Sequence, residues 1–155
     1  MTANATAVAQ RTDDIVADLA TLEGPLLPIL HAVQAAFGYV PQEALPRIAE
    51  GLNLSRAEVH GVMSFYHDFR TEPAGRHVVK LCRAEACQAQ GADALAVHAQ
   101  ARLGTAFHGT AKGVTLEQVF CLGLCACGPA ALVDGEVVGR LDAAKLDAIL
   151  SEFGA

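Results

Sequence analysis

Tryptophan is absent from this chain of 155 residues, and aromatic residues make up only 5% of it. Lysine and arginine number 11 against 17 acidic residues, which gives a formal net charge of −6, and no two lysines or arginines are adjacent. Nucleic-acid surfaces need clustered cations to displace counterions from phosphate, and many also stack bases on aromatic rings. The composition therefore argues against a nucleic-acid partner.

Long apolar runs are also missing. No run approaches the roughly 20 residues that a bilayer span requires. The N-terminal sequence MTANATAVAQRTDDIVADL lacks the basic start and unbroken apolar stretch of a secretory signal. We therefore expect a cytoplasmic protein with no direct membrane insertion. Hydrophobic residues make up 52% of the chain, enough to bury the core of a small domain with a helical extension.

Motifs for nucleotide, flavin or hydrolytic chemistry are lacking as well. There is no G-x-G-x-x-G or Walker A sequence, Ser64 has no G-x-S-x-G setting, and no paired carboxylates suggest acid–base work. The six histidines lie outside the cysteine-rich segments, where a surface or core role is more common than metal ligation. We expect no catalytic site in this chain alone.

The N-terminal half has helical patterns. Residues 1–11 are small and polar without periodicity, so we expect a flexible arm there, and Thr12 is a plausible N-cap. Ser55 and Glu58 form a capping box, and Gly51 is expected to stop the helix before it. The expected helices cover about residues 12–23, 26–37, 42–50 and 56–66. They predict a small helical bundle over residues 12–71.

Residues 71–75 have turn composition and mark a boundary to a second domain over residues 72–155. Asp134-Gly135 between apolar runs predicts a type I′ hairpin turn, and Asp142 predicts the cap of a last helix. Strands are expected at 77–82 and 114–120, a helix at 91–103 and the hairpin at 130–139. The fold class predicted is α+β: a helical bundle followed by a thioredoxin-like α/β domain with a mixed sheet.

All five cysteines lie in two groups. Cys82 and Cys87 are spaced C-x4-C, and Cys121, Cys125 and Cys127 lie together further along the chain. Both groups follow predicted strands, and open α/β sheets place ligand sites at the carboxyl ends of their strands. We therefore expect the two loops to meet and four thiolates to hold a metal centre.

The type of centre is argued from spacing. Structural zinc sites commonly use C-x2-C knuckles, whereas a binuclear iron–sulfur cluster spreads its thiolates over two irons and suits wider intervals. A redox dithiol needs C-x-x-C, which is absent, and cysteines that merely pack as small hydrophobes would not gather in two tight groups. Spacing leaves open whether Cys125 or Cys127 is the fourth ligand. A zinc-stapled interaction module and a free-standing ferredoxin remain the alternatives.

Several motifs carry a resemblance to a known family. C-R-A-E-A-C at 82–87 and C-L-G-L-C at 121–125 resemble the thioredoxin-like [2Fe–2S] ferredoxin family. LLPILHAVQAAFGYVP at 26–41 and LNLSRAEVHGVMSFYHDF at 52–69 resemble it too, so the likeness covers nearly all of residues 24–155. This family includes the small iron–sulfur subunits of NADH:quinone oxidoreductase, NAD-reducing hydrogenases and NAD-dependent formate dehydrogenases.

The resemblance implies a ligand set and a role. Cys82, Cys87, Cys121 and Cys125 would hold one [2Fe–2S] cluster, and Cys127 would have no ligand role. The chain would be an electron-transfer subunit that exchanges single electrons with the FMN of a partner iron–sulfur subunit, which also binds NAD. The loop sequences LCRAEACQAQG and CLGLCACGPAALVDG are most similar to gamma subunits of soluble molybdenum-containing NAD-dependent formate dehydrogenases. They imply a larger molybdenum-containing, formate-oxidising subunit as a further partner.

Five of the eight aromatic residues lie between Phe37 and Phe69. Helix–helix packing is the commonest explanation for such a group. The alternative is that Phe65, Tyr66 and Phe69 form a docking face for the flavin subunit, and each explanation can hold for different residues.

Overall fold

The computed structural model describes residues 2–155, with side chains from Ala5 onward. The chain divides into two compact units, Met1–Pro73 and Ala74–Ala155. Each unit encloses a hydrophobic core of its own. Within the described residues, every helix falls short of the length and apolar character that a bilayer crossing needs.

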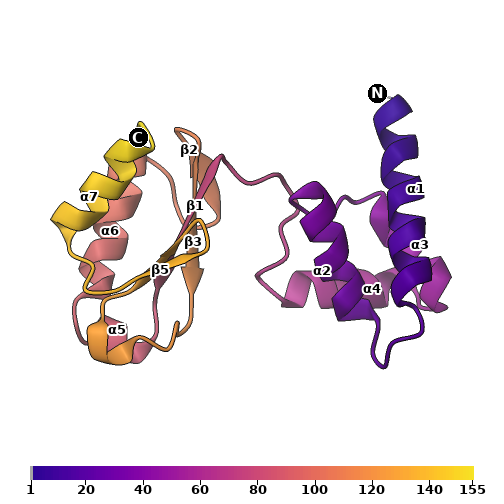
Figure 1. Cartoon of the computed structure of the whole chain (residues 1–155), viewed down its shortest axis with the longest axis horizontal. Helices are drawn as coiled ribbons and strands as arrows, with labels where there is room; N and C mark the ends of the chain where they lie inside the picture. Colours follow the sequence, from indigo (N-terminus) through magenta and orange to yellow (C-terminus); the bar gives the residue numbers. More distant parts are fainter. Residues whose placement is uncertain (1) are drawn as a thin grey trace. The chain divides into compact units, whose positions relative to one another are not determined.

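Four helices make up the described part of the first unit (Figure 1). They are α1 (Thr2–Leu19), α2 (Leu26–Phe37), α3 (Ala44–Leu52) and α4 (Arg56–Phe65). The apolar faces of all four contribute to one core, whose fully buried side chains include Ile29, Leu30, Val33, Ile48 and Val59. The bounds of α2 agree with the prediction. Gly38 ends it in the left-handed conformation, with φ 80°.

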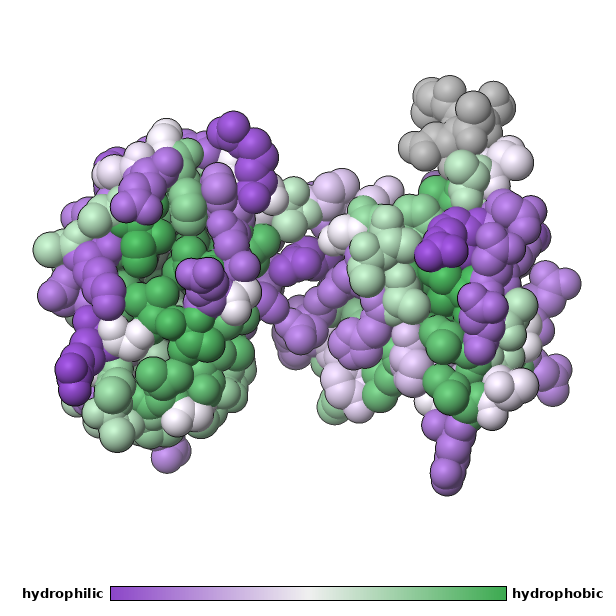
Figure 2. Space-filling model, in the orientation of Figure 1, coloured by the Kyte–Doolittle hydropathy of each residue, from purple (hydrophilic) through white to green (hydrophobic). Residues whose placement is uncertain are grey.

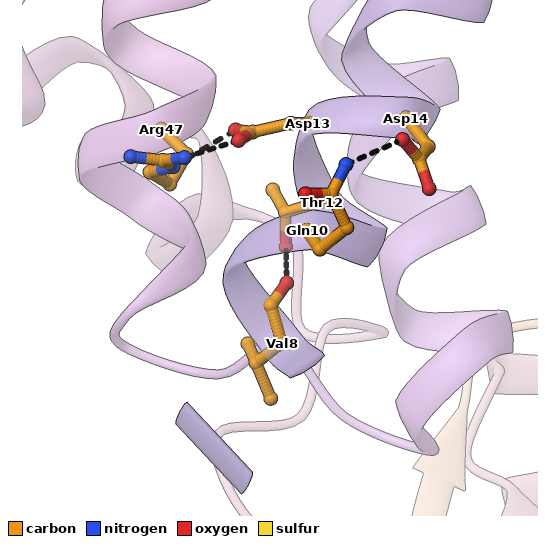
Figure 3. Close-up of polar contacts among 6 residues, drawn as sticks. All are labelled: Val8, Gln10, Thr12, Asp13, Asp14 and Arg47. Atoms are coloured by element: carbon orange, nitrogen blue, oxygen red, sulfur yellow. Dashed lines mark hydrogen bonds and ion pairs between the residues drawn. The ribbon is translucent and has the colours of Figure 1, made fainter. Parts of the chain in front are cut away.

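The first helix begins ten residues earlier than predicted, so residues 2–11 are helical and do not form an arm. Alanine favours helix here, and Val8 and Thr12 share a buried side with Ile15. Thr12, predicted as an N-cap, lies inside α1 and is fully buried. Its hydroxyl donates to the carbonyl of Val8, one turn earlier in the helix, at 2.7 Å (Figure 3). The buried hydroxyl therefore has a hydrogen-bond partner. A polar residue in the apolar stripe concealed the periodicity.

The third helix runs past Gly51, which we predicted would stop it. Asn53 ends α3 instead, in the left-handed conformation with φ 54°. Gly51 has a different purpose, because a Cβ there would overlap the Cγ1 of Val16 on α1. The missing side chain lets the two helices approach closely, and Arg47 on α3 forms forked hydrogen bonds with Asp13 on α1 (Figure 3).

The fourth helix begins as predicted. The hydroxyl of Ser55 accepts a hydrogen bond from the backbone N–H of Glu58 at 3.2 Å, and the Glu58 carboxylate accepts one from the Ser55 N–H at 2.8 Å. The reciprocal bonds satisfy two backbone donors that a helix start leaves free.

The second unit is built on a five-stranded sheet with the order β2-β3-β1-β4-β5. Its strands are β1 (His77–Cys82), β2 (Gly109–Ala111), β3 (Val114–Val119), β4 (Ala131–Val133) and β5 (Glu136–Val138). β1 and β3 are parallel and the other neighbours are antiparallel, so the predicted mixed sheet is confirmed. The helices α6 (Ala92–Leu103) and α7 (Ala143–Glu152) lie on one side of it (Figure 1).

Local rules place most of these elements. Asp134 and Gly135 both have positive φ, 48° and 91°, as the type I′ turn between β4 and β5 requires. The Asp142 carboxylate caps α7 by accepting from the N–H of Lys145 at 2.8 Å. Three short elements were not predicted, β2, the helix α5 (Glu85–Gln88) and the 3-10 helix η1 (Cys125–Cys127), because three or four residues carry no periodic signal.

The two faces of the sheet differ in chemistry. Val79 and Leu116 face α6 and α7 in the core. The alternate residues Lys80 and Glu117 are directly opposite each other in the parallel register. The Nζ of Lys80 lies 3.1 Å from Oε2 of Glu117, and the side chains are only 17% and 9% exposed. This ion pair is therefore largely shielded from water.

Replacing Gly51 by Ala should lower the free energy of unfolding by about 1–3 kcal/mol, because the new methyl overpacks the contact with Val16. Gly61 is the matched control, since it lies inside α4 with no atom of another element within 4 Å of a Cβ. Gly61→Ala should raise stability by about 1 kcal/mol. Urea denaturation followed by far-ultraviolet circular dichroism gives both values, and equal effects would contradict the close approach of α1 and α3.

Replacing Lys80 by Met should destabilise the second unit by about 3–5 kcal/mol, because it leaves the Glu117 carboxylate buried without its cation. The double variant K80M/E117L should recover most of that loss, since two apolar groups of similar size need no partner. Amide hydrogen exchange in β1 and β3 reports the stability of this unit alone. A double variant as unstable as K80M would show that the ion pair itself is required.

Candidate metal centre

The ends of β1 and β3 bring the two cysteine groups together. Cys82 is the last residue of β1 and lies opposite Val119, the last residue of β3. Cys121 follows two residues later. Parallel strands that end side by side deliver both loops to one edge of the sheet. Leu122 and Leu124 of the second loop pack against the buried Cys82 and Cys87, so the loops meet as expected.

The short helix α5 positions the second cysteine of the first loop. The N–H groups of Cys87 and Gln88 both donate to the Ala84 carbonyl, at 2.9 and 3.0 Å. This turn carries the chain back, so that Cys87 and Cys82 lie in one buried cluster. Both cysteines are 2% exposed. The first pair of thiols therefore lies on the inner side of the site.

The second loop is shaped by two left-handed residues, Cys121 with φ 75° and Gly123 with φ 77°. A 3-10 helix, η1 (Cys125–Cys127), follows. The Sγ atoms of Cys121 and Cys125 lie 3.7 Å apart, and both residues are exposed. A tetrahedral ion with metal–sulfur bonds of about 2.3 Å, the length known for zinc, sets two thiolates about 3.8 Å apart. This pair is spaced to bind one metal ion.

Backbone donors of both loops converge on Cys82. Burial would raise the pKa of this thiol, but hydrogen bonds from the N–H of Ala84 and from the Cys87 thiol oppose it. The N–H groups of Cys121 and Leu122 in the second loop add to them, and the pKa is lowered on balance. Donors arranged in this way favour the thiolate, which is the metal-binding form.

The neighbouring thiols have the opposite tendency. Burial and the hydrogen bond with Cys82 raise the pKa of Cys87, and the thiolates of Cys82 and Cys125 repel its charge further. The hydrogen bond and charge of Cys121 raise the pKa of Cys125, with smaller contributions from burial and from Cys82. A cation bound between the loops would relieve the repulsion that raises the pKa of Cys87 and Cys125.

Cys127 has a different environment. It lies at the end of η1, where its N–H donates to the Leu124 carbonyl at 2.9 Å. Its own carbonyl accepts from the N–H of Arg140 at 2.6 Å, and a Cβ on Gly139 would lie 3.3 Å from its Cβ. The residue thus packs against the segment that follows β5.

Gln90, which was not predicted as a site residue, connects the two loops. Its Nε2 donates to the carbonyl of Ala86 at 2.8 Å and to that of Cys125 at 3.1 Å. Gly128 lies beneath this amide, because a Cβ there would be 2.8 Å from the Gln90 Nε2 and 3.4 Å from the Cys87 Sγ. An exposed glutamine in a polar loop carries no sequence signal for such a contact.

Histidines have structural contacts, in keeping with the roles predicted for them. His77 Nδ1 lies 2.7 Å from the Asp134 carboxylate, and its ring stacks on Phe153 with centroids 3.8 Å apart. His98 is hydrogen-bonded to Asp147 at 2.8 Å, joining α6 to α7. Among residues 2–155, no three His, Cys, Asp or Glu side chains are grouped to hold a single metal ion.

The donor set fits a binuclear iron–sulfur cluster. Cys121 and Cys125 have the spacing of two ligands on one ion, and Cys82 and Cys87 lie together in one buried cluster beside them. Thiolates suit zinc and iron–sulfur centres and not hard cations. Backbone N–H groups directed at ligand sulfurs are a means by which proteins tune iron–sulfur clusters.

Known proteins resemble this chain over most of its length. One component of the NADH-quinone oxidoreductase of Rhizobium meliloti is 36% identical over 132 residues, which are 84% of this chain and 79% of the relative. The HndA component of the NADP-reducing hydrogenase of Solidesulfovibrio fructosivorans is 32% identical over 134 residues, 84% of this chain and 78% of that relative.

A solved structure resembles the fold. A chain of an NAD+-reducing [NiFe]-hydrogenase in its air-oxidized state matches with a TM-score of 0.68 at 30% identity. The match covers 83% of this chain, which spans about a fifth (22%) of the hydrogenase chain. The family model for thioredoxin-like [2Fe–2S] ferredoxins matches residues 12–154, almost the whole sequence. The chain thus belongs to the thioredoxin-like [2Fe–2S] ferredoxin family.

Proposed function

We propose that this chain is the [2Fe–2S] electron-transfer subunit of an NAD-linked oxidoreductase complex. The observation that carries the proposal is the meeting of two thiol pairs at the ends of β1 and β3 in a member of this family. Cys82, Cys87, Cys121 and Cys125 would hold the cluster. When bound, a [2Fe–2S] cluster accepts and returns one electron at a time.

The surrounding residues are suited to this task. Cys82 and Cys87 are buried and exclude water from the inner side of the site, while Cys121 and Cys125 leave the outer side accessible. The N–H groups of Cys121 and Leu122 donate toward Cys82, which offsets the negative charge that thiolate ligands bring. Electrons would therefore enter and leave through the second loop.

An apolar surface surrounds that exposed side. Phe120, next to Cys121, is 68% exposed, and Leu122 and Leu124 are partly exposed beside it. Figure 2 shows apolar residues gathered over the end of the second unit at which α5 lies in Figure 1. Exposed apolar patches mark interaction sites, so a partner that exchanges electrons would approach here.

The partner is inferred from the relatives. Those reported above are subunits of an NADH-quinone oxidoreductase and of NAD(P)-reducing hydrogenases, which supports a complex of one of these types. FMN and NAD would then be bound by a partner iron–sulfur subunit and not by this chain. A NAD-dependent formate dehydrogenase, with a molybdenum-containing formate-oxidising subunit, is the second candidate, supported only by the loop sequences around the cysteines.

The first unit offers a second contact surface. Phe65 is 73% exposed and Tyr66 44% exposed at the end of α4, with their rings 5.2 Å apart in an edge arrangement. Phe69 is buried in the helical core, its ring 4.8 Å from that of His31. The packing explanation therefore applies to Phe69, and the docking hypothesis is kept for Phe65 and Tyr66.

Absorption and EPR spectra test the cluster. The purified protein should be brown, contain two iron atoms per chain, lose visible absorption with dithionite and give an EPR signal on reduction. Replacing any of Cys82, Cys87, Cys121 or Cys125 by Ser should remove most of the iron, whereas C127S should keep it. A colourless protein with stoichiometric zinc would refute the proposal, and iron loss in C127S alone would overturn the ligand assignment.

Co-purification tests the surface on the first unit. The variant F65A/Y66A should recover at least about fivefold less flavin-containing partner from the native host, because the exposed aromatic rings would be lost from the interface. L22A is the matched control, since Leu22 is an exposed apolar residue of the same unit outside α4. The subunits recovered with the unaltered protein identify the parent complex. Equal recovery for both variants would remove this surface from the interface.

A further inference from the structure

We propose that Gln90 is a positioning residue that clamps the two cysteine loops together and sets the distance between the two thiol pairs. This inference rests on the proposed function, because the clamp matters only where both pairs bind one cluster. Its side-chain amide is hydrogen-bonded to both loops at once, to Ala86 in the first and Cys125 in the second.

The backbone of Gln90 is itself anchored to the first loop. Its N–H donates to the carbonyl of Cys87 at 3.1 Å, and Gly91 then turns the chain away with φ 95°. The side chain therefore leaves from a fixed point one turn beyond a buried cysteine. The amide at its end binds the backbone carbonyl of Cys125 in the second loop. Cys125 itself is exposed.

Other contacts between the loops act deeper in the site. Arg83 donates its N–H to the Val119 carbonyl at 2.8 Å, which continues the pairing of β1 with β3. Leu122 of the second loop packs against the buried cluster that contains Cys82 and Cys87. These contacts fix the start of the second loop at its strand. Gln90 binds the second loop at Cys125, four residues after Cys121. Cys125 would bind the outer side of the cluster.

Gly128 supports the same assignment. It has an ordinary φ of −72°, so its own backbone does not require glycine. A Cβ at this position would nevertheless lie 2.8 Å from the Gln90 amide and 3.4 Å from the Cys87 sulfur. The chain that follows η1 thus passes close to the Gln90 amide. Glycine at position 128 leaves room for that amide.

The experiment uses the full chain with its cluster and the near-isosteric substitution Gln90→Met, which keeps the volume of the side chain and removes its donors. Gln88→Met is the matched control, because the Gln88 amide donates to the Arg83 carbonyl at 2.8 Å within the first loop alone. Visible absorbance during incubation with a ferrous chelator gives the rate of cluster loss, and EPR of the reduced protein gives the cluster signature.

Q90M should lose its cluster about 2- to 10-fold faster than the unaltered protein, the factor that corresponds to one ordinary hydrogen bond. Its EPR signal should broaden, since the two thiol pairs are no longer held at one separation. Q88M should match the unaltered protein in both measurements. Unchanged kinetics and spectrum in Q90M would overturn the proposal, and so would equal changes in Q88M.

Amide hydrogen exchange in the apo-protein separates this inference from the proposed function. The N–H of Cys127, bonded to the Leu124 carbonyl, should exchange about 2- to 10-fold faster in Q90M than in Q88M, because the clamp restrains η1. If the unaltered protein binds no iron, the proposed function fails, while this exchange rate still decides whether Gln90 holds the loops together. Equal exchange in the two variants would refute the clamp.

Discussion

The parallel pairing of β1 with β3 is the constraint on which the second unit depends. It sets Val79 beside Leu116 in the core and, three residues further along β1, Cys82 beside Val119 at the sheet edge. A slip of one residue would turn core side chains to the opposite face and separate the two cysteine loops. The same register therefore determines both the hydrophobic core and the position of the thiols.

Burial gives the site two unlike sides. Thiolates on the inner side lose water, a cost that backbone N–H groups offset at Cys82. The outer side, with Cys121 and Cys125, stays exposed, and the backbone of Cys121 is left-handed there. The proposed electron-transfer centre would need both properties, protection from solvent on one side and access on the other.

Local chemistry explains which parts of the fold were predictable from sequence. The capping box at Ser55, the end of α2 at Phe37 and the Asp134-Gly135 turn depend on neighbours in the chain, and all three are as predicted. The early start of α1 was missed because buried Thr12 interrupts the apolar stripe. Cysteine grouping at strand ends predicted that the two loops meet, but Gln90 depends on a contact 35 residues away and has no local signature.

Glycine illustrates the limit of such prediction most clearly. Gly38 and Gly104 end helices with φ near 80° and 75°, and their need for glycine is a property of their own backbone. Gly51 and Gly128 have no such need. A side chain at Gly51 would overlap Val16, and a side chain at Gly128 would lie too close to the Gln90 amide. Sequence patterns cannot distinguish these two kinds of glycine, since the second kind is defined by a partner from elsewhere in the fold. Close approach therefore places Gly128 beside the proposed metal centre, although it would contribute no ligand.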